Sequence, residues 1–115
     1  MAVVFVLARD WTLRTSVRAE LVEAGIHALG MDSPQDAGQA LASGQLPAAM
    51  VVEATAGLAD VPAISEMISR VPTVLVASRA EKLDLPAAAA VIYRPVRIGE
   101  IVRKVQELIG KGQAA

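Results

Sequence analysis

Hydrophobic and polar positions follow two alternating patterns along this chain. Short runs of consecutive apolar residues, apolar on both faces, are typical of parallel strands that helices cover on both sides. Segments whose apolar residues recur every three or four positions are typical of amphipathic helices. The two kinds of segment follow one another along the chain. The pattern therefore predicts strands that alternate with helices.

The apolar runs predict five strands. They cover residues 3–7, 26–31, 48–52, 73–77 and 91–93. The second run is the weakest of the five, and the third is followed directly by Glu53. Each run is about as long as one strand of a small sheet.

Two helices are predicted between the first three strands. Asp10 is placed to cap the first helix, and Gly25 is placed to end it. Its apolar face consists of Leu13, Val17, Leu21 and Ala24. The second helix begins after Ser33 with Pro34 at its first position, and it ends near Gly44.

Two further helices are predicted in the second half. Asp60 and Pro62 open one of them. The other follows the last strand, and its apolar residues are Ile98, Ile101, Val102, Val105, Leu108 and Ile109. Gly110 is expected to end it, which leaves residues 111–115 as a disordered tail.

Alternating strands and helices imply one α/β domain over residues 1–115, a doubly wound five-stranded parallel sheet with right-handed crossovers. In such sheets the ligand or reactive site lies where the strands end. The residues at those ends are Ala8, Arg9, Asp10, Glu53, Ala77, Ser78 and Arg94.

Composition narrows the possible functions. The net charge of −1, with both signs interspersed, lacks the electrostatic pattern of a direct nucleic-acid binder. The absence of cysteine excludes disulfides, thiolate catalysis and cysteine-ligated zinc. No apolar stretch approaches the roughly 20 residues of a membrane helix. We therefore expect a soluble cytoplasmic protein.

The residues Val91, Ile92, Tyr93, Arg94 and Pro95 precede an amphipathic helix. Together with the order of the strands and helices, they resemble the receiver domains of two-component response regulators, over essentially the whole chain. In that family the last strand ends in Lys-Pro, and the domain has a flavodoxin-like topology. The resemblance implies signal transduction by phosphorelay.

The resemblance also implies positions for the family's phosphorylation pocket. The pair of acids that helps bind Mg²⁺ falls on Ala8 and Arg9, with Asp10 one place further on. The phosphoacceptor position is Glu53. The hydroxyl position falls on Ala77, beside Ser78, and the family's lysine is replaced by Arg94, followed by Pro95.

These departures predict a pseudo-receiver. The two arginines and two carboxylates of the pocket cancel, so it offers little to Mg²⁺, which needs several oxygen ligands. Glu53 is one methylene longer than aspartate, which moves its oxygens out of line for phosphoryl transfer. We expect no Mg²⁺, no catalytic residue, and an ion pair of Glu53 with Arg94 rather than with Arg9.

The connection between residues 77 and 91 is unusually short for a parallel crossover. It contains Pro86 and a run of alanines, so only residues 79–85 are expected to coil, with Leu83 and Leu85 as apolar anchors. The family's fourth helix would then be reduced. Family members commonly change partners through this helix and the elements after it, so this surface is expected to differ.

Three functions remain open. The first is a non-enzymatic signalling module that binds a protein partner, such as a sensor kinase or an output protein. A second copy of the chain, giving a homodimer, is a further candidate partner. The second is a phospho-accepting receiver with an unusual pocket. The third is a small flavodoxin-like cofactor carrier. Fold alone does not separate them.

Three single residues are candidates for a role. Trp11, the only tryptophan, stands at the start of the first helix, and packing over the site is favoured over an exposed partner contact. His27 has no second histidine or cysteine to share a metal, which favours a surface position. Gly57 lacks the glycine-rich pattern of a phosphate-binding loop.

Overall fold

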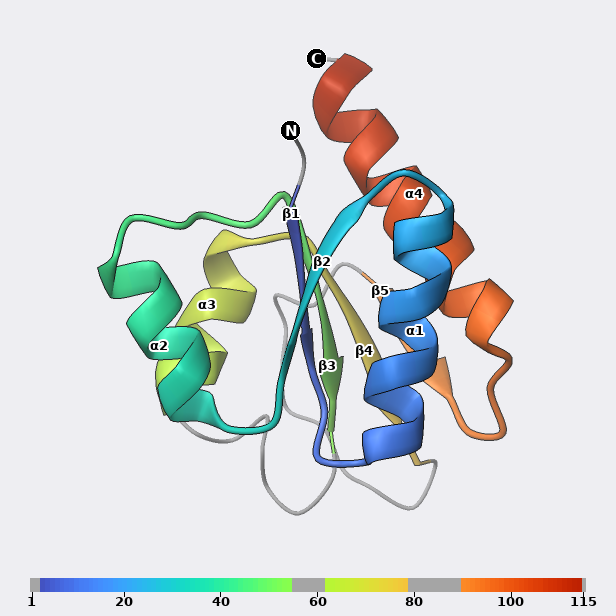
Figure 1. The fold of residues 1–115 in the computed structure, drawn as a ribbon, viewed down its shortest axis with the longest axis horizontal. Coiled ribbons are helices and arrows are strands. Elements are labelled where there is room, and N and C mark those ends of the chain that lie inside the picture. Colours follow the sequence, from blue (N-terminus) through green and yellow to red (C-terminus); the bar gives the residue numbers. More distant parts are fainter. Residues whose placement is uncertain (1–2, 55–61, 79–89, 115) are drawn as a thin grey trace.

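A computed structural model describes residues 3–54, 62–78 and 90–114 of the protein. The strands of the described residues form a single sheet (Figure 1). They are β1 (Val3–Leu7), β2 (His27–Met31), β3 (Ala49–Glu53), β4 (Thr73–Ala77) and β5 (Ala90–Tyr93). Their order is β2-β1-β3-β4-β5, and every neighbouring pair is parallel. The predicted strands are confirmed, with shifts of one residue at some ends.

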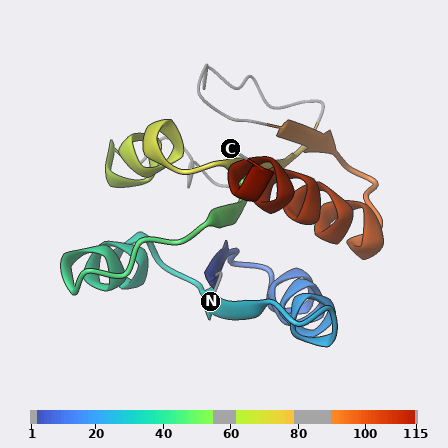
Figure 2. The ribbon, with the colours of Figure 1, turned by 90° about the horizontal axis from the view of Figure 1, so that it is seen from above.

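Four helices cover the sheet in the described part of the chain. They are α1 (Trp11–Glu23), α2 (Pro34–Ala42), α3 (Pro62–Arg70) and α4 (Ile98–Ala114). Figure 2 shows α1 and α4 on one side of the sheet and α2 and α3 on the other. The fold is therefore the doubly wound α/β arrangement that the sequence predicts.

Alternation within the strands supplies a hydrophobic core on each face of the sheet, because successive side chains of a strand point to opposite faces. In β1, Val4 and Val6 pack toward α1 and α4, whereas Phe5 and Leu7 pack toward α2 and α3. All four are fully buried. The continuous apolar runs of the sequence correspond to strands with two covered faces.

The ends of the first two helices follow from local chemistry. The Asp10 carboxylate accepts hydrogen bonds from the backbone N–H groups of Thr12 (2.9 Å) and Leu13 (3.2 Å), so it caps α1. Ser33 caps α2 in the same way. Gly25 and Gly44 follow these helices with φ of +83° and +91°, a backbone conformation that favours glycine.

The expectation that Gly110 ends the last helix is wrong, because α4 continues to Ala114. A glycine ends a helix when it adopts positive φ, as Gly25 and Gly44 do, whereas Gly110 stays helical.

The reduced fourth helix predicted in residues 79–85 lies outside the described residues, as do Asp60 and Gly57. No helix of the described residues has the length and apolar character to cross a membrane.

Candidate functional site

The carboxyl ends of the strands meet along one edge of the sheet, at the bottom of Figure 1. Glu53 is the last residue of β3, Ala77 is the last residue of β4, and Arg94 follows β5 directly. Ala8 follows β1, and β1 is the neighbour of β3 on the side away from β4. The parallel register therefore brings together residues that lie far apart in the sequence.

Glu53 is the centre of this edge. Its residue is only 3% exposed, so its carboxylate needs compensation within the protein. One oxygen, Oε1, accepts hydrogen bonds from the backbone N–H groups of Arg9 (2.8 Å) and Asp10 (3.1 Å). The other, Oε2, lies 2.6 Å from Nη2 of Arg94. Both oxygens are therefore engaged. The predicted ion pair with Arg94 is present, through one nitrogen and one oxygen and not through two of each.

Arg94 reaches Glu53 across the end of β4, because β4 lies between β3 and β5. The backbone N–H of Arg94 donates to the carbonyl of Ala77 (2.8 Å), which continues the pairing of β5 with β4 past Tyr93. The peptide bond from Arg94 to Pro95 is cis. The Arg94 side chain keeps 36% of its surface exposed and the Glu53 side chain keeps 4%, so the ion pair joins a partly exposed cation to a buried carboxylate.

The residues after β1 contribute mainly through their backbone. Ala8 is fully buried, and its carbonyl accepts a hydrogen bond from Nη1 of Arg14 at 2.7 Å. Arg9 is exposed, and it is its amide, not its guanidinium, that contacts Glu53. Asp10 directs its carboxylate to α1. The sequence did not predict the two amide contacts, because they depend on the path of the backbone.

No protein-family model matches this sequence, and no curated protein matches it. Solved structures do match. A response regulator receiver protein from Burkholderia phymatum is 18% identical with a TM-score of 0.79, and the match covers 96% of each chain. The Francisella response regulator 1452 receiver domain is 13% identical with a TM-score of 0.80, covering 97% of this chain and 99% of that one.

A CheY-like receiver domain protein from Methanospirillum hungatei JF-1 is 16% identical with a TM-score of 0.78, covering 99% of this chain and 98% of that one. This chain has a response-regulator receiver fold. At these identities the likeness establishes the fold of the receiver domain alone. Its chemistry has to be argued from the residues of this chain.

The receiver fold raises the question whether these residues fit Mg²⁺, the metal of the family's pocket. Among the described residues, no three histidine, aspartate or glutamate side chains come together as a metal site. The Glu53 carboxylate faces the Arg94 cation, and the Asp10 carboxylate caps α1. A hard divalent ion needs several oxygen ligands, so this arrangement does not fit it.

The remaining pocket positions have no assigned role. Ala77 is fully buried and carries no hydroxyl, Ser78 is half-buried, and Pro95 is exposed. A switching role for Ser78 stays a prediction. His27 lies on β2 with an exposed side chain, as its isolation in the sequence indicates.

The interpretation of Trp11 as a packing residue is wrong, because Trp11 is 68% exposed. Leu13, Val17 and Leu21 form the buried face of α1. Successive helical residues are rotated by about 100°, so Trp11 lies about 200° from Leu13, on the opposite side of the helix. A contact with a partner, the alternative interpretation of Trp11, stays a prediction.

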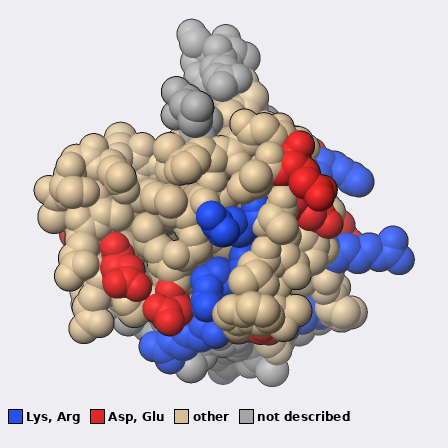
Figure 3. Space-filling view, viewed as in Figure 1, with Lys and Arg blue, Asp and Glu red and all other residues tan. Residues whose placement is uncertain are grey.

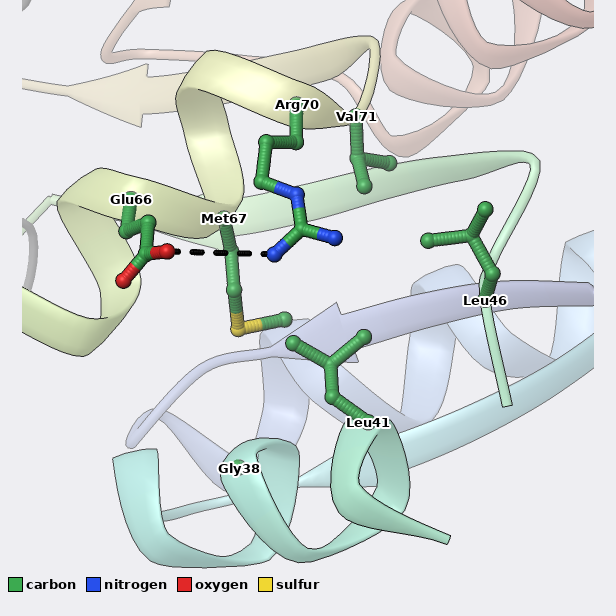
Figure 4. Close-up of a pocket in the computed structure, with 7 residues that line it drawn as sticks. All are labelled: Gly38, Leu41, Leu46, Glu66, Met67, Arg70 and Val71. Carbon is green, nitrogen blue, oxygen red and sulfur yellow. Dashed lines mark ion pairs between the residues drawn. The ribbon is translucent and has the colours of Figure 1, made fainter. Parts of the chain in front are cut away.

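A hollow lies between α2 and α3, beside Leu46 and Val71, which precede β3 and β4 (Figure 4). It has a volume of about 120 Å³, and Met67 points from α3 toward Leu41 of α2. The two charges at its rim, Glu66 and Arg70, pair with each other at 3.8 Å. This hollow therefore has an apolar lining, and its charged residues are paired within one helix.

Proposed function

We propose that this receiver-fold domain is a non-enzymatic signalling module, which acts through contact with a protein partner and is not phosphorylated on Glu53. The observation that carries the proposal is the engagement of both Glu53 oxygens, by two backbone amides and by Arg94. A sensor kinase or an output protein is the class of partner that the receiver fold suggests. The cytoplasm is the matching location.

The chemistry of phosphoryl transfer supports this proposal. A carboxylate nucleophile has to present a free oxygen in line with the phosphorus atom, and the developing charge has to be neutralised. Here Oε2 of Glu53 is held by Arg94, and Oε1 accepts two N–H groups. Attack would require the ion pair to break, and the carboxylates of the described residues do not form a magnesium site. The same ion pair would hold Glu53 and Arg94 in one fixed arrangement, without a switch between two conformations.

Treatment with acetyl phosphate and Mg²⁺, followed by intact-mass measurement, tests the proposal. We expect no added phosphoryl group on the wild-type protein, while a phosphorylatable receiver treated in parallel gains one. A gain that Glu53→Gln abolishes would overturn the proposal. Glu66→Gln is the matched control, because Glu66 is an exposed glutamate on α3 that pairs with Arg70 and not with Arg94.

The purified protein also tests the cofactor-carrier alternative. Native mass spectrometry is expected to give the mass of the polypeptide, as one or two copies. A stoichiometric flavin or nucleotide retained on the protein would favour the flavodoxin-like alternative over a signalling module. The proportion of dimer in the same spectra measures the homodimer hypothesis.

A further inference from the structure

A cleft lies along the open edge of the sheet, between α1 and the edge strand β2. Its volume is about 330 Å³, and it is lined by Trp11, Arg14, Thr15, Arg18, Leu29 and Gly30. Figure 3 shows the molecule from the same side as Figure 1, with Lys and Arg side chains gathered near the middle. In Figure 1, α1 and β2 lie side by side in this region. The cleft is therefore a cationic surface whose lining does not include Glu53 or Arg94.

The two arginines of the cleft are held in place by backbone carbonyls. Nη1 of Arg14 donates to the carbonyl of Ala8 (2.7 Å), and Nε of Arg18 donates to the carbonyl of Ala28 (3.1 Å). Within the described ranges, neither arginine has a carboxylate partner. Each guanidinium has five N–H donors, so most of the donors remain available for a ligand. The cleft therefore presents two ordered guanidinium groups that form no ion pair with a described carboxylate.

Gly30 makes room for these side chains. A Cβ atom at position 30 would lie 3.2 Å from Cγ and 3.4 Å from Cδ of Arg14, and 3.7 Å from Cδ of Arg18. The first distance is tighter than ordinary van der Waals contact, so a larger residue would displace the Arg14 stem. The absence of a side chain at Gly30 therefore lets both arginine stems lie over the edge strand.

Arg18 also determines how a partner can approach. Successive carbonyl groups of a strand point to opposite sides within the sheet. The carbonyl of Met31 points toward β1, because it accepts a hydrogen bond from the N–H of Ala8. The carbonyl of Ala28, three residues earlier, therefore points to the open side of β2. Arg18 occupies that outward carbonyl. A partner strand would have to displace Arg18 to pair with β2 at this point, so side-chain contacts are favoured.

We infer that this cleft binds a short acidic segment of a protein partner. Its carboxylates would pair with Arg14 and Arg18, and an apolar side chain beside them would pack on Trp11 and Leu29. The planar guanidinium fork matches a carboxylate. Exposed tryptophan and arginine are the residue types that carry most energy at protein contacts. The inference rests on the proposed function, since it names the surface and the chemistry of the contact.

Charge favours a protein segment over a nucleic acid. The chain has a net charge of −1, and the cleft contains two arginines. Nucleic-acid affinity depends on many phosphate contacts, which release bound counterions. Two cations within a chain of negative net charge fit a short acidic peptide better.

Trp11 provides a direct measurement, because it is the only tryptophan in the chain and lines the cleft. The probe is a short peptide of alternating glutamate and leucine, compared with a peptide in which glutamine replaces glutamate. We expect a saturable change in Trp11 fluorescence with the glutamate peptide, weakened by added salt, and none with the glutamine peptide. The double variant Arg14→Gln/Arg18→Gln should weaken binding about tenfold or more. Arg103→Gln, an exposed arginine on α4, is the matched control and should bind as the wild type does.

Several results would overturn the inference. These are no response to the glutamate peptide, an equal response to both peptides, unchanged binding by a folded double variant, and stronger binding of a single-stranded DNA oligomer. If circular dichroism shows that the double variant is unfolded, the two peptides compared on the wild-type protein still decide. Phosphorylation is measured on the same sample by mass. A phosphorylated protein that binds the peptide contradicts the proposed function alone, and an unphosphorylated protein that ignores the peptide contradicts the cleft alone.

Discussion

Two charged regions of this molecule differ in whether their charges are paired within the chain. At the strand ends, the buried Glu53 carboxylate is satisfied by two amides and by Arg94. In the cleft beside β2, Arg14 and Arg18 are held by carbonyl oxygens, which fix their position without neutralising their charge. The first region is closed within the chain, and the second leaves charge for a partner.

The difference follows from burial. A charge away from water is costly unless it is paired and hydrogen-bonded, so a closed arrangement around Glu53 is a condition for folding with that residue inside. A charge at the surface is solvated, and an unpaired arginine there costs the fold little. The closed region is therefore expected to matter for stability, and the open region for binding.

The largest expected effect comes from opening the closed region. Arg94→Met should lower the free energy of unfolding by about 2 kcal/mol, because it leaves the Glu53 carboxylate without its cation, although half-exposure of Arg94 moderates the loss. Urea denaturation measures the free energy of unfolding of Arg94→Met, of Glu53→Gln and of the variant that combines the two changes.

The double variant Glu53→Gln/Arg94→Met sharpens this test. It should be more stable than Arg94→Met alone, because the uncompensated charge is gone, with a coupling between the sites of about 1 kcal/mol. Additive effects in this double-mutant cycle would show that the two residues do not act as a pair.

An intermediate effect is expected at Asp10, which stands between the two regions. Asp10→Ala should cost about 1 kcal/mol, the usual value of a lost helix cap, because its carboxylate accepts from Thr12 and Leu13. Thermal unfolding measures it. Glu20→Ala, a change of an exposed acid in the last turn of α1, away from the Asp10 cap, is the control. Equal losses in the two variants would mean that Asp10 does not act as a cap.

The smallest effect on stability is expected in the open region. Arg18→Gln should cost about 0.5 kcal/mol, because water can replace its single hydrogen bond at the sheet edge. Urea denaturation compares it with Arg94→Met. A loss as large as that of Arg94→Met would contradict the distinction between a closed and an open region.

The amino-acid sequence determined the fold through local patterns. Runs such as residues 3–7 predict covered parallel strands, and the residues Asp10, Gly25, Ser33 and Gly44 mark the helix ends that the structure has. These signals are strong because burial on both faces and helix capping depend on near neighbours in the chain. Gly110 failed as a signal, since a glycine ends a helix only when its φ becomes positive, and nothing local required that.

The candidate sites divide along the same line. The pairing of Glu53 with Arg94 was predictable, because parallel strands must end at one edge and opposite charges stood at two of those ends. Only the tertiary structure decided three other features. They are the amides that hold Glu53, the exposure of Trp11 and the packing of Arg14 against Gly30. Backbone donors have no residue type to identify them, and a cleft between a helix and a strand exists only once packing has brought them together.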